Sequence, residues 1–134
     1  MAKAKRVAYF KAKIEDKPGA LLGLAKDLKA KKLDLIGLRG VGQAGQGEIL
    51  VIAKSPDKLR DAWKASGALA EEGVAFFLSG ADKTGALVAA LDAIANAGVN
   101  IVATEALAFG RKFGAILWVA PEDVDKATKA LCAK

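Results

Sequence analysis

The chain begins with an alternation of apolar and polar positions. Between residues 7 and 14 the apolar face would be made of Ala8, Phe10, Ala12 and Ile14. A period of two predicts a strand with one buried face. Over residues 19–31 the spacing becomes helical, and one face then collects Leu21, Leu24, Ala25 and Leu28. The first two expected elements are therefore a strand and an amphipathic helix.

Two further strands and a second helix follow in the first half of the chain. The strands are expected at 33–41 and 48–54. Ser55 and Pro56 then provide an N-cap followed by a proline at the first helical position, which predicts a helix over 57–66.

This order of elements occurs twice. Asp16–Leu21 recurs 66 residues later as Asp82–Leu87, with five of six positions identical. The same shift aligns the apolar positions on both sides. It predicts a second set of elements, with strands at 74–79, 99–107 and 113–120 and helices at 85–97 and from Pro121 onward.

Each copy therefore has the order strand–helix–strand–strand–helix. With right-handed crossovers, this order predicts an α+β fold of two ferredoxin-like units, each an antiparallel sheet with both helices on one face. We expect the domains at residues 1–70 and 71–134. A complete unit ends with a fourth strand, but only residues 67–72 are left for it in the first copy. The fourth strand is expected to be short, absent or exchanged, with edge pairing between the copies, between chains, or both.

The amino-acid composition limits the kinds of partner, catalytic site and metal site that the chain can have. Hydrophobic residues make up 53% of the 134 positions, which is enough for a packed core, and the net charge is +6. We interpret the charge, including the run around residues 26–32, as a solvated basic surface, although an anionic partner stays open. There is no histidine, which removes Ser/His and Cys/His pairs and the usual zinc sites. No carboxylate pair stands out, so we predict no catalytic residues, no metal, no cofactor and no enzyme activity.

Three other features of the sequence bear on its function. Gly40–Gly45 matches G-x-G-x-x-G, but it precedes a strand and not a helix, so a hairpin is the better interpretation. The equivalent hairpin in the second copy is Phe109–Gly114.

The single cysteine, Cys132, fits a reducing cytoplasm. No apolar run approaches the roughly 20 residues of a membrane-spanning helix, so no membrane association is expected.

The repeated motif resembles the ACT domain family. In the first copy the resemblance is carried by Asp16–Leu21 and by Leu33-Asp34-Leu35-Ile36, and in the second by Asp82–Leu87 and Gly98-Val99-Asn100-Ile101. The resemblance covers nearly the whole chain. It implies a regulatory module that binds a free amino acid or similar metabolite and modulates a partner enzyme of amino-acid metabolism, with the ligand held between two domains.

The resemblance also implies where the ligand would bind. The preferred site combines the helix start of the first copy with the second strand of the second copy: Asp16, Lys17, Pro18, Gly19, Ala20, Leu21, Asn100 and Ile101. The reciprocal site is expected to be weaker, because Thr84 replaces the proline and Asp34 the asparagine. It comprises Asp82, Lys83, Thr84, Gly85, Ala86, Leu87, Asp34 and Leu35.

Simple chemistry supports these assignments. Backbone N–H groups at a helix start can hold a carboxylate, Asp16 or Asp82 could hold an ammonium group, and Asn100 could bridge both. The first two strands of such a unit are parallel, which puts the loop and the strand start at opposite ends of the sheet. A second domain or a homodimer is then needed to bring them together.

Structural interpretations remain open beside the functional ones. The two aspartates can be helix caps, Gly19 and Gly85 can serve close packing, and Asn100 can shape a turn. The whole protein can also be an interaction module without a ligand. An RNA-binding module of the same fold would need aromatic side chains on its central strands, where only Trp118 occurs, which argues against nucleic acid.

Overall fold

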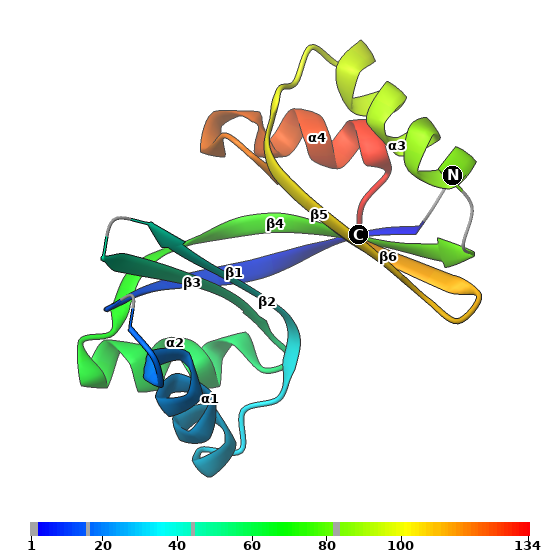
Figure 1. The fold of residues 1–134 in the computed structure, drawn as a ribbon. Coiled ribbons are helices and arrows are strands. Elements are labelled where there is room, and N and C mark those ends of the chain that lie inside the picture. Colours follow the sequence, from blue (N-terminus) through cyan, green and yellow to red (C-terminus); the bar gives the residue numbers. More distant parts are fainter. Residues whose placement is uncertain (1–2, 16, 44, 82–83) are drawn as a thin grey trace. The chain divides into compact units, whose positions relative to one another are not determined.

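A computed structural model describes the chain except for residues 1–2, 16, 44, 82 and 83. Its helices and strands follow the predicted order (Figure 1). The strands are β1 (Lys3–Glu15), β2 (Leu35–Gln43), β3 (Gln46–Ala53), β4 (Leu69–Ala81), β5 (Ile101–Phe109) and β6 (Lys112–Val119). The helices are α1 (Ala20–Ala30), α2 (Pro56–Ser66), α3 (Thr84–Asn96) and α4 (Val124–Leu131), with a short 3-10 turn, η1 (Pro121–Asp123), before α4. The predicted α+β class is confirmed.

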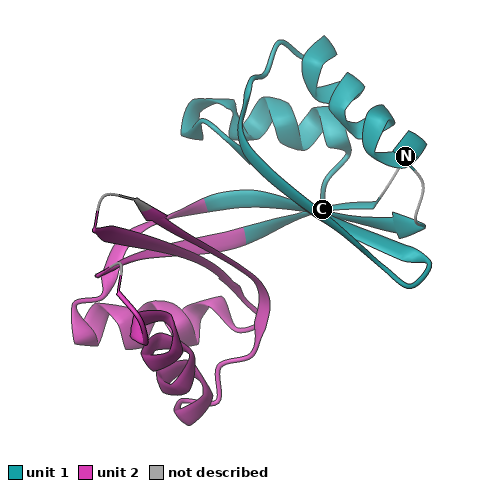
Figure 2. Ribbon diagram, viewed as in Figure 1, with its two compact units in different colours: residues 1–7, 74–134 teal, residues 8–73 magenta. Residues whose placement is uncertain are grey.

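The chain forms two compact units (Figure 2). Unit 2 consists of residues 8–73, and unit 1 consists of residues 1–7 together with 74–134. The domains expected from the repeat, 1–70 and 71–134, stay a prediction. In the structure, β1 and β4 each contribute residues to both units.

This sharing supplies a fourth strand to each unit. In unit 2 the strand order is β2-β3-β1-β4, and only residues 69–73 of β4 take part. In unit 1 the order is β1-β4-β6-β5, and the β1 segment is residues 3–7. The fourth strand of each unit is thus a short stretch of a long strand.

The strand register repeats along the chain. In β1 and β3, Phe10 pairs with Val51; in β4 and β6, Phe76 pairs with Leu117, 66 residues further on in both strands. A register shift in the strand pairing also recurs at the equivalent place. It lies between Leu35 and Gly37 in β2 and between Ile101 and Ala103 in β5. The shift found in the sequence is therefore also the shift of the strand pairing.

Each unit has its own hydrophobic core, because both of its helices cover the same face of its strands (Figure 1). In unit 2 the aromatic residues Phe10 and Trp63 are buried against aliphatic neighbours that include Leu28, Ile49, Val51 and Leu59. In unit 1 the buried residues include Phe76, Leu78, Ile94, Leu117 and Leu131. The strand faces are buried as their alternation predicted. The helical face predicted over residues 19–31 is buried only in part, since Leu28 is buried and Leu24 packs against the core of unit 2. Leu21, at 44%, and Ala25 are exposed.

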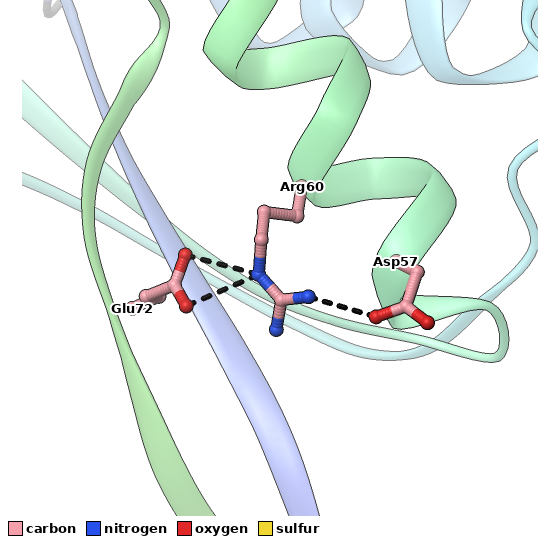
Figure 3. Close-up of polar contacts among 3 residues, drawn as sticks. All are labelled: Asp57, Arg60 and Glu72. Atoms are coloured by element: carbon pink, nitrogen blue, oxygen red, sulfur yellow. Dashed lines mark hydrogen bonds and ion pairs between the residues drawn. The ribbon is translucent and has the colours of Figure 1, made fainter.

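Charged groups hold the fourth strand of unit 2 in place. Arg60 of α2 donates from Nε to both carboxylate oxygens of Glu72, at 3.1 and 3.2 Å, and from Nη1 to Asp57 at 2.7 Å (Figure 3). The same guanidinium lies 5.3 Å from the ring centroid of Phe10. Arg60 therefore ties residues 69–73 to the helix and covers a core aromatic ring.

The neighbouring Glu71 belongs to a second polar cluster. It accepts a hydrogen bond from the Tyr9 hydroxyl at 3.1 Å and forms an ion pair with Lys11 at 3.2 Å. Lys11 also pairs with Glu48 at 3.0 Å, which links β4, β1 and β3. Because successive side chains of a strand point to opposite faces, Glu71 and Glu72 fasten the strand on both sides.

The fourth strand of unit 1 is held by the backbone at the other end of the chain. Arg6 N–H donates to the Lys134 carbonyl at 3.0 Å, and Lys134 N–H donates to the Ala4 carbonyl at 3.4 Å. Ala4 also packs against the core of unit 1. Among the described residues, no helix has the length and apolar character needed to cross a lipid bilayer.

Candidate functional site

The loop before α1 is the first predicted ligand segment. Asp16 lies outside the described residues. Lys17 forms an ion pair with Glu15 at 2.9 Å, and Ala20 N–H donates to the Lys17 carbonyl at 3.3 Å. Gly19 occupies the N-cap with a φ of 87°, a left-handed conformation that favours glycine. A glycine cap has no side-chain acceptor, so the first-turn N–H groups of α1 that follow Ala20 are suited to an anionic ligand group.

The structure argues against the close-packing interpretation of the two motif glycines. A Cβ built on Gly19 or Gly85 would have no heavy atom within 4 Å. The requirement at Gly19 is its backbone conformation, whereas Gly85 lies inside the first turn of α3.

Other predicted ligand residues lie before β5 and at the start of α3. Asn100 is exposed immediately before β5, and Ile101, the first residue of that strand, is partly buried. Asp82 and Lys83 lie outside the described residues. Thr84 and Gly85 open α3 and are exposed, while Ala86 and Leu87 pack against the core of unit 1.

Within one unit, the helix start and the strand start are far apart. Both α1 and α3 run between these two segments, and at 1.5 Å per residue α1 is about 16 Å long. Gly19 and Asp34 therefore lie at opposite ends of α1, and Gly85 and Asn100 at opposite ends of α3. The structure does not bring the two kinds of segment together inside a single unit.

A pocket of about 390 Å³ lies at the C-terminal end of α1 in unit 2. Its walls come from the last turns of the helix and the segment that leads into β2. The lining residues are Ala25, Leu28, Lys29, Lys32, Leu33, Asp34 and Leu35. The predicted residues Asp34 and Leu35 are thus part of a concave site.

The pocket combines an apolar floor with a charged rim. Leu28 and Leu33 are buried, whereas Lys29, Lys32 and Asp34 are exposed. None of these three charged side chains forms an ion pair or a hydrogen bond with another residue that the structure describes. Lys29 and Lys32 belong to the basic run that the sequence predicts to be a solvated surface, and their place beside Asp34 was not predicted.

Lys32 has an unusual backbone. Its φ is 57°, and the turn is closed by hydrogen bonds from Lys32 N–H to the Lys29 carbonyl at 3.0 Å and from Leu33 N–H to the Leu28 carbonyl at 2.9 Å. The equivalent residue of unit 1 is Gly98, with a φ of 74°. A side chain in this conformation costs roughly 1–2 kcal/mol, which glycine avoids.

The glycine-rich segment is followed by a strand and not by a helix. Residues 40–43 form the end of β2, Gly45 lies in the turn before β3, and β2 and β3 are antiparallel. The predicted hairpin is therefore confirmed. Outside residues 1–2, 16, 44, 82 and 83, no group of three or more potential metal ligands occurs.

Comparison with known proteins gives relatives by structure only. No family model matches the chain, and no curated protein sequence is significantly similar to it. Protein BT0572 from Bacteroides thetaiotaomicron has a similar structure, with a TM-score of 0.82, 22% sequence identity, and coverage of 96% of this chain and 88% of that one.

Two regulatory subunits of aspartate kinase have the same kind of fold. The ligand-free subunit from Thermus thermophilus matches with a TM-score of 0.61 and 13% identity, over 96% of this chain and 91% of that one. The subunit from Thermus flavus matches with a TM-score of 0.57 and 13% identity, over 98% and 94%. These likenesses support the ACT-like fold that the repeated motif implied.

Proposed function

We propose that this chain is a non-catalytic regulatory protein that binds a free amino acid and modulates a partner enzyme of amino-acid metabolism. The observation that carries the proposal is the fold shared, over nearly the whole chain, with regulatory subunits of aspartate kinase. The proposal includes two tandem ferredoxin-like units of the ACT type and a homodimer as the assembled form.

Two features of the chain support ligand binding. The start of α1 offers backbone N–H groups behind a glycine cap, which suits a carboxylate. The pocket at the other end of α1 contains Asp34 and Leu35 from the reciprocal set. We therefore keep both predicted residue sets as ligand-binding candidates: Asp16–Leu21 with Asn100 and Ile101, and Asp82–Leu87 with Asp34 and Leu35.

A thermal-shift panel of the free amino acids tests the proposal. A ligand at 100 times its dissociation constant should stabilise the folded chain by roughly 2.7 kcal/mol. Asn100→Ala should weaken the response to a ligand of the preferred site. Asn96→Ala is the matched control, because Asn96 is exposed at the end of α3 and belongs to neither predicted set. No stabilisation by any amino acid at millimolar concentration would refute ligand binding.

An interaction module without a ligand is the second candidate. It is favoured by β5, which is an edge strand of unit 1 and exposes Val102, Leu107 and Phe109 at 65, 74 and 86%. Exposed apolar edges tend to pair with other strands. This candidate predicts no response to amino acids and an oligomer that Leu107→Lys disrupts, as measured by light scattering.

A further inference from the structure

We infer that the pocket at the C-terminal end of α1 in unit 2 binds an acidic amino acid, a ligand with two carboxylates and one ammonium group. This inference rests on the proposed amino-acid binding and names the ligand class of one site. It depends on three features of the pocket: its charges, the conformation of Lys32 and the contrast with the same place in unit 1.

The charges of the rim match such a ligand. Lys29 and Lys32 provide two ammonium groups and Asp34 provides one carboxylate. Two carboxylates and one ammonium group are complementary to this set, whereas a neutral amino acid would leave one lysine unpaired. A basic amino acid would add a second cation to a rim that already has an excess of positive charge. Charge complementarity therefore selects the acidic side chain.

The floor of the pocket suits the rest of the ligand. Leu28 and Leu33 are buried beneath the rim, and Leu35 is partly buried beside them. The methylene groups of a short acidic side chain can contact these leucines while its charged ends reach the rim. Small-ligand sites commonly combine apolar walls with a few placed polar groups in this way.

The backbone of Lys32 is a separate observation. A lysine occupies a left-handed position that is glycine in the equivalent turn of unit 1. Backbone strain of this kind is retained where the surrounding structure or the function requires the residue. Lys32 is one of the residues that line the pocket, so a ligand bound there would account for a lysine at this position.

Unit 1 lacks all three charges at the equivalent place. Lys29, Lys32 and Asp34 correspond to Ala95, Gly98 and Asn100 at the shift of 66 that relates the strand registers. The expectation that Asp34 weakens its site did not include the neighbouring lysines. With Lys29 and Lys32 beside it, Asp34 becomes the partner of the ligand ammonium group and the pocket keeps a net positive charge.

Calorimetric titration of the full chain with L-glutamate and L-aspartate tests the inference, with L-glutamine, L-asparagine and L-lysine as comparisons. At low salt we expect the acidic amino acids to bind at least tenfold more tightly than their amides. The preference should shrink as ionic strength rises, because the charges lie at the surface.

Two lysine variants and one control locate the site. Lys29→Gln and Lys32→Gly should each weaken glutamate binding several-fold, and the double variant about tenfold or more. Lys32→Gly should leave the chain at least as stable in urea, because glycine relieves the left-handed strain, so lost binding cannot be attributed to unfolding. Lys26→Gln removes the same charge from an exposed position of α1 outside the pocket and should bind glutamate normally.

The failures of the two proposals differ. If neutral amino acids bind as tightly as acidic ones, or if the lysine variants bind glutamate as well as the control does, this inference is wrong while the proposed function stands. If no amino acid binds at all, the proposed function fails and the inference fails with it.

Discussion

Units 1 and 2 share a register and differ in their exposed chemistry. Phe10 and Phe76 occupy the same place in their strands and are both fully buried. At the end of the first helix, however, unit 2 has Lys29 and Lys32 where unit 1 has Ala95 and Gly98. The apolar positions thus maintain the same backbone and core in both units, while exposed positions at the same register can carry different residues and serve different functions.

A second contrast lies in the first strand of each unit. Tyr9 and Lys11 of β1 interact with Glu71, and their equivalents in β4 are Ala75 and Phe77. The polar cluster that fastens the fourth strand is therefore a property of unit 2. Unit 1 holds its fourth strand through backbone hydrogen bonds of Lys134 instead.

The largest expected effect concerns what the two units have in common. Phe10→Ala and Phe76→Ala should each lower the free energy of unfolding by about 3–5 kcal/mol, because each leaves a cavity in a closed core. Urea unfolding measures both. Val102→Ala, at a largely exposed side chain, should change stability by less than about 0.5 kcal/mol. A small effect at only one of the two phenylalanines would show that the cores are not equivalent.

A medium effect is expected where the units differ in backbone strain. Gly98→Ala should destabilise the chain by about 1–2 kcal/mol, because its φ of 74° is unfavourable for any residue with a Cβ. The new methyl group would meet no atom within 4 Å, so the cost is conformational. Lys32→Ala at the equivalent position should be nearly neutral in the same urea measurement, since lysine already has the strained conformation. Equal effects of the two substitutions would contradict this explanation.

The smallest expected effect is a loss of stability at alkaline pH. It arises from Tyr9 and Lys11 of unit 2. Partial burial raises the pKa of Tyr9 above 10.0, and the charge and hydrogen bond of Glu71 raise it further. Burial lowers the pKa of Lys11, but hydrogen bonds with Glu48 and Glu71 outweigh it and leave the pKa above 10.5. The folded state thus holds both protons more tightly than the unfolded chain does. Their contribution is fully present below pH 10 and is lost as the pH rises through the raised values.

This effect can be followed directly, because Tyr9 is the only tyrosine of the chain. The tyrosinate absorbance of the folded protein should appear at higher pH than that of the urea-unfolded protein. Tyr9→Phe should reduce the loss of stability above pH 10. Tyrosinate absorbance that appears at the same pH in both states would contradict the interaction with Glu71.

The sequence predicted most elements and missed those that depend on distant partners. The alternation around Phe10 and the repeat of Asp16–Leu21 were sufficient for the order of helices and strands. The start of β4 was missed because Glu71 and Glu72 do not look like strand residues. In the structure they lie in β4 next to β1, where they contact Tyr9, Lys11 and Arg60, and these partners are far away in the sequence.

Fewer residues of the candidate site than of the helices and strands could be predicted from the sequence. Asp34 and Leu35 were selected through the motif, and both line a pocket. Lys29 and Lys32 could not be distinguished from the other lysines of the run 26–32, because a charge run usually marks a solvated surface. Their selection required the turn geometry after α1, and in particular the left-handed backbone of Lys32.

The division of β1 between the two units has a consequence for the order of folding. Unit 2 is continuous in sequence, while the two pieces of unit 1 are separated by the 66 residues of unit 2. If unit 2 were disordered, bringing the two pieces of unit 1 together would close a loop of that length. The length-dependent part of the loop-closure entropy would then cost about 4 kcal/mol. Folded unit 2 removes most of this cost, because the Tyr9 ring near its start packs against Gly73 at its end. We expect residues 8–73 to fold first, so that pulse-labelling hydrogen exchange shows protection in β3 before it appears in residues 3–7.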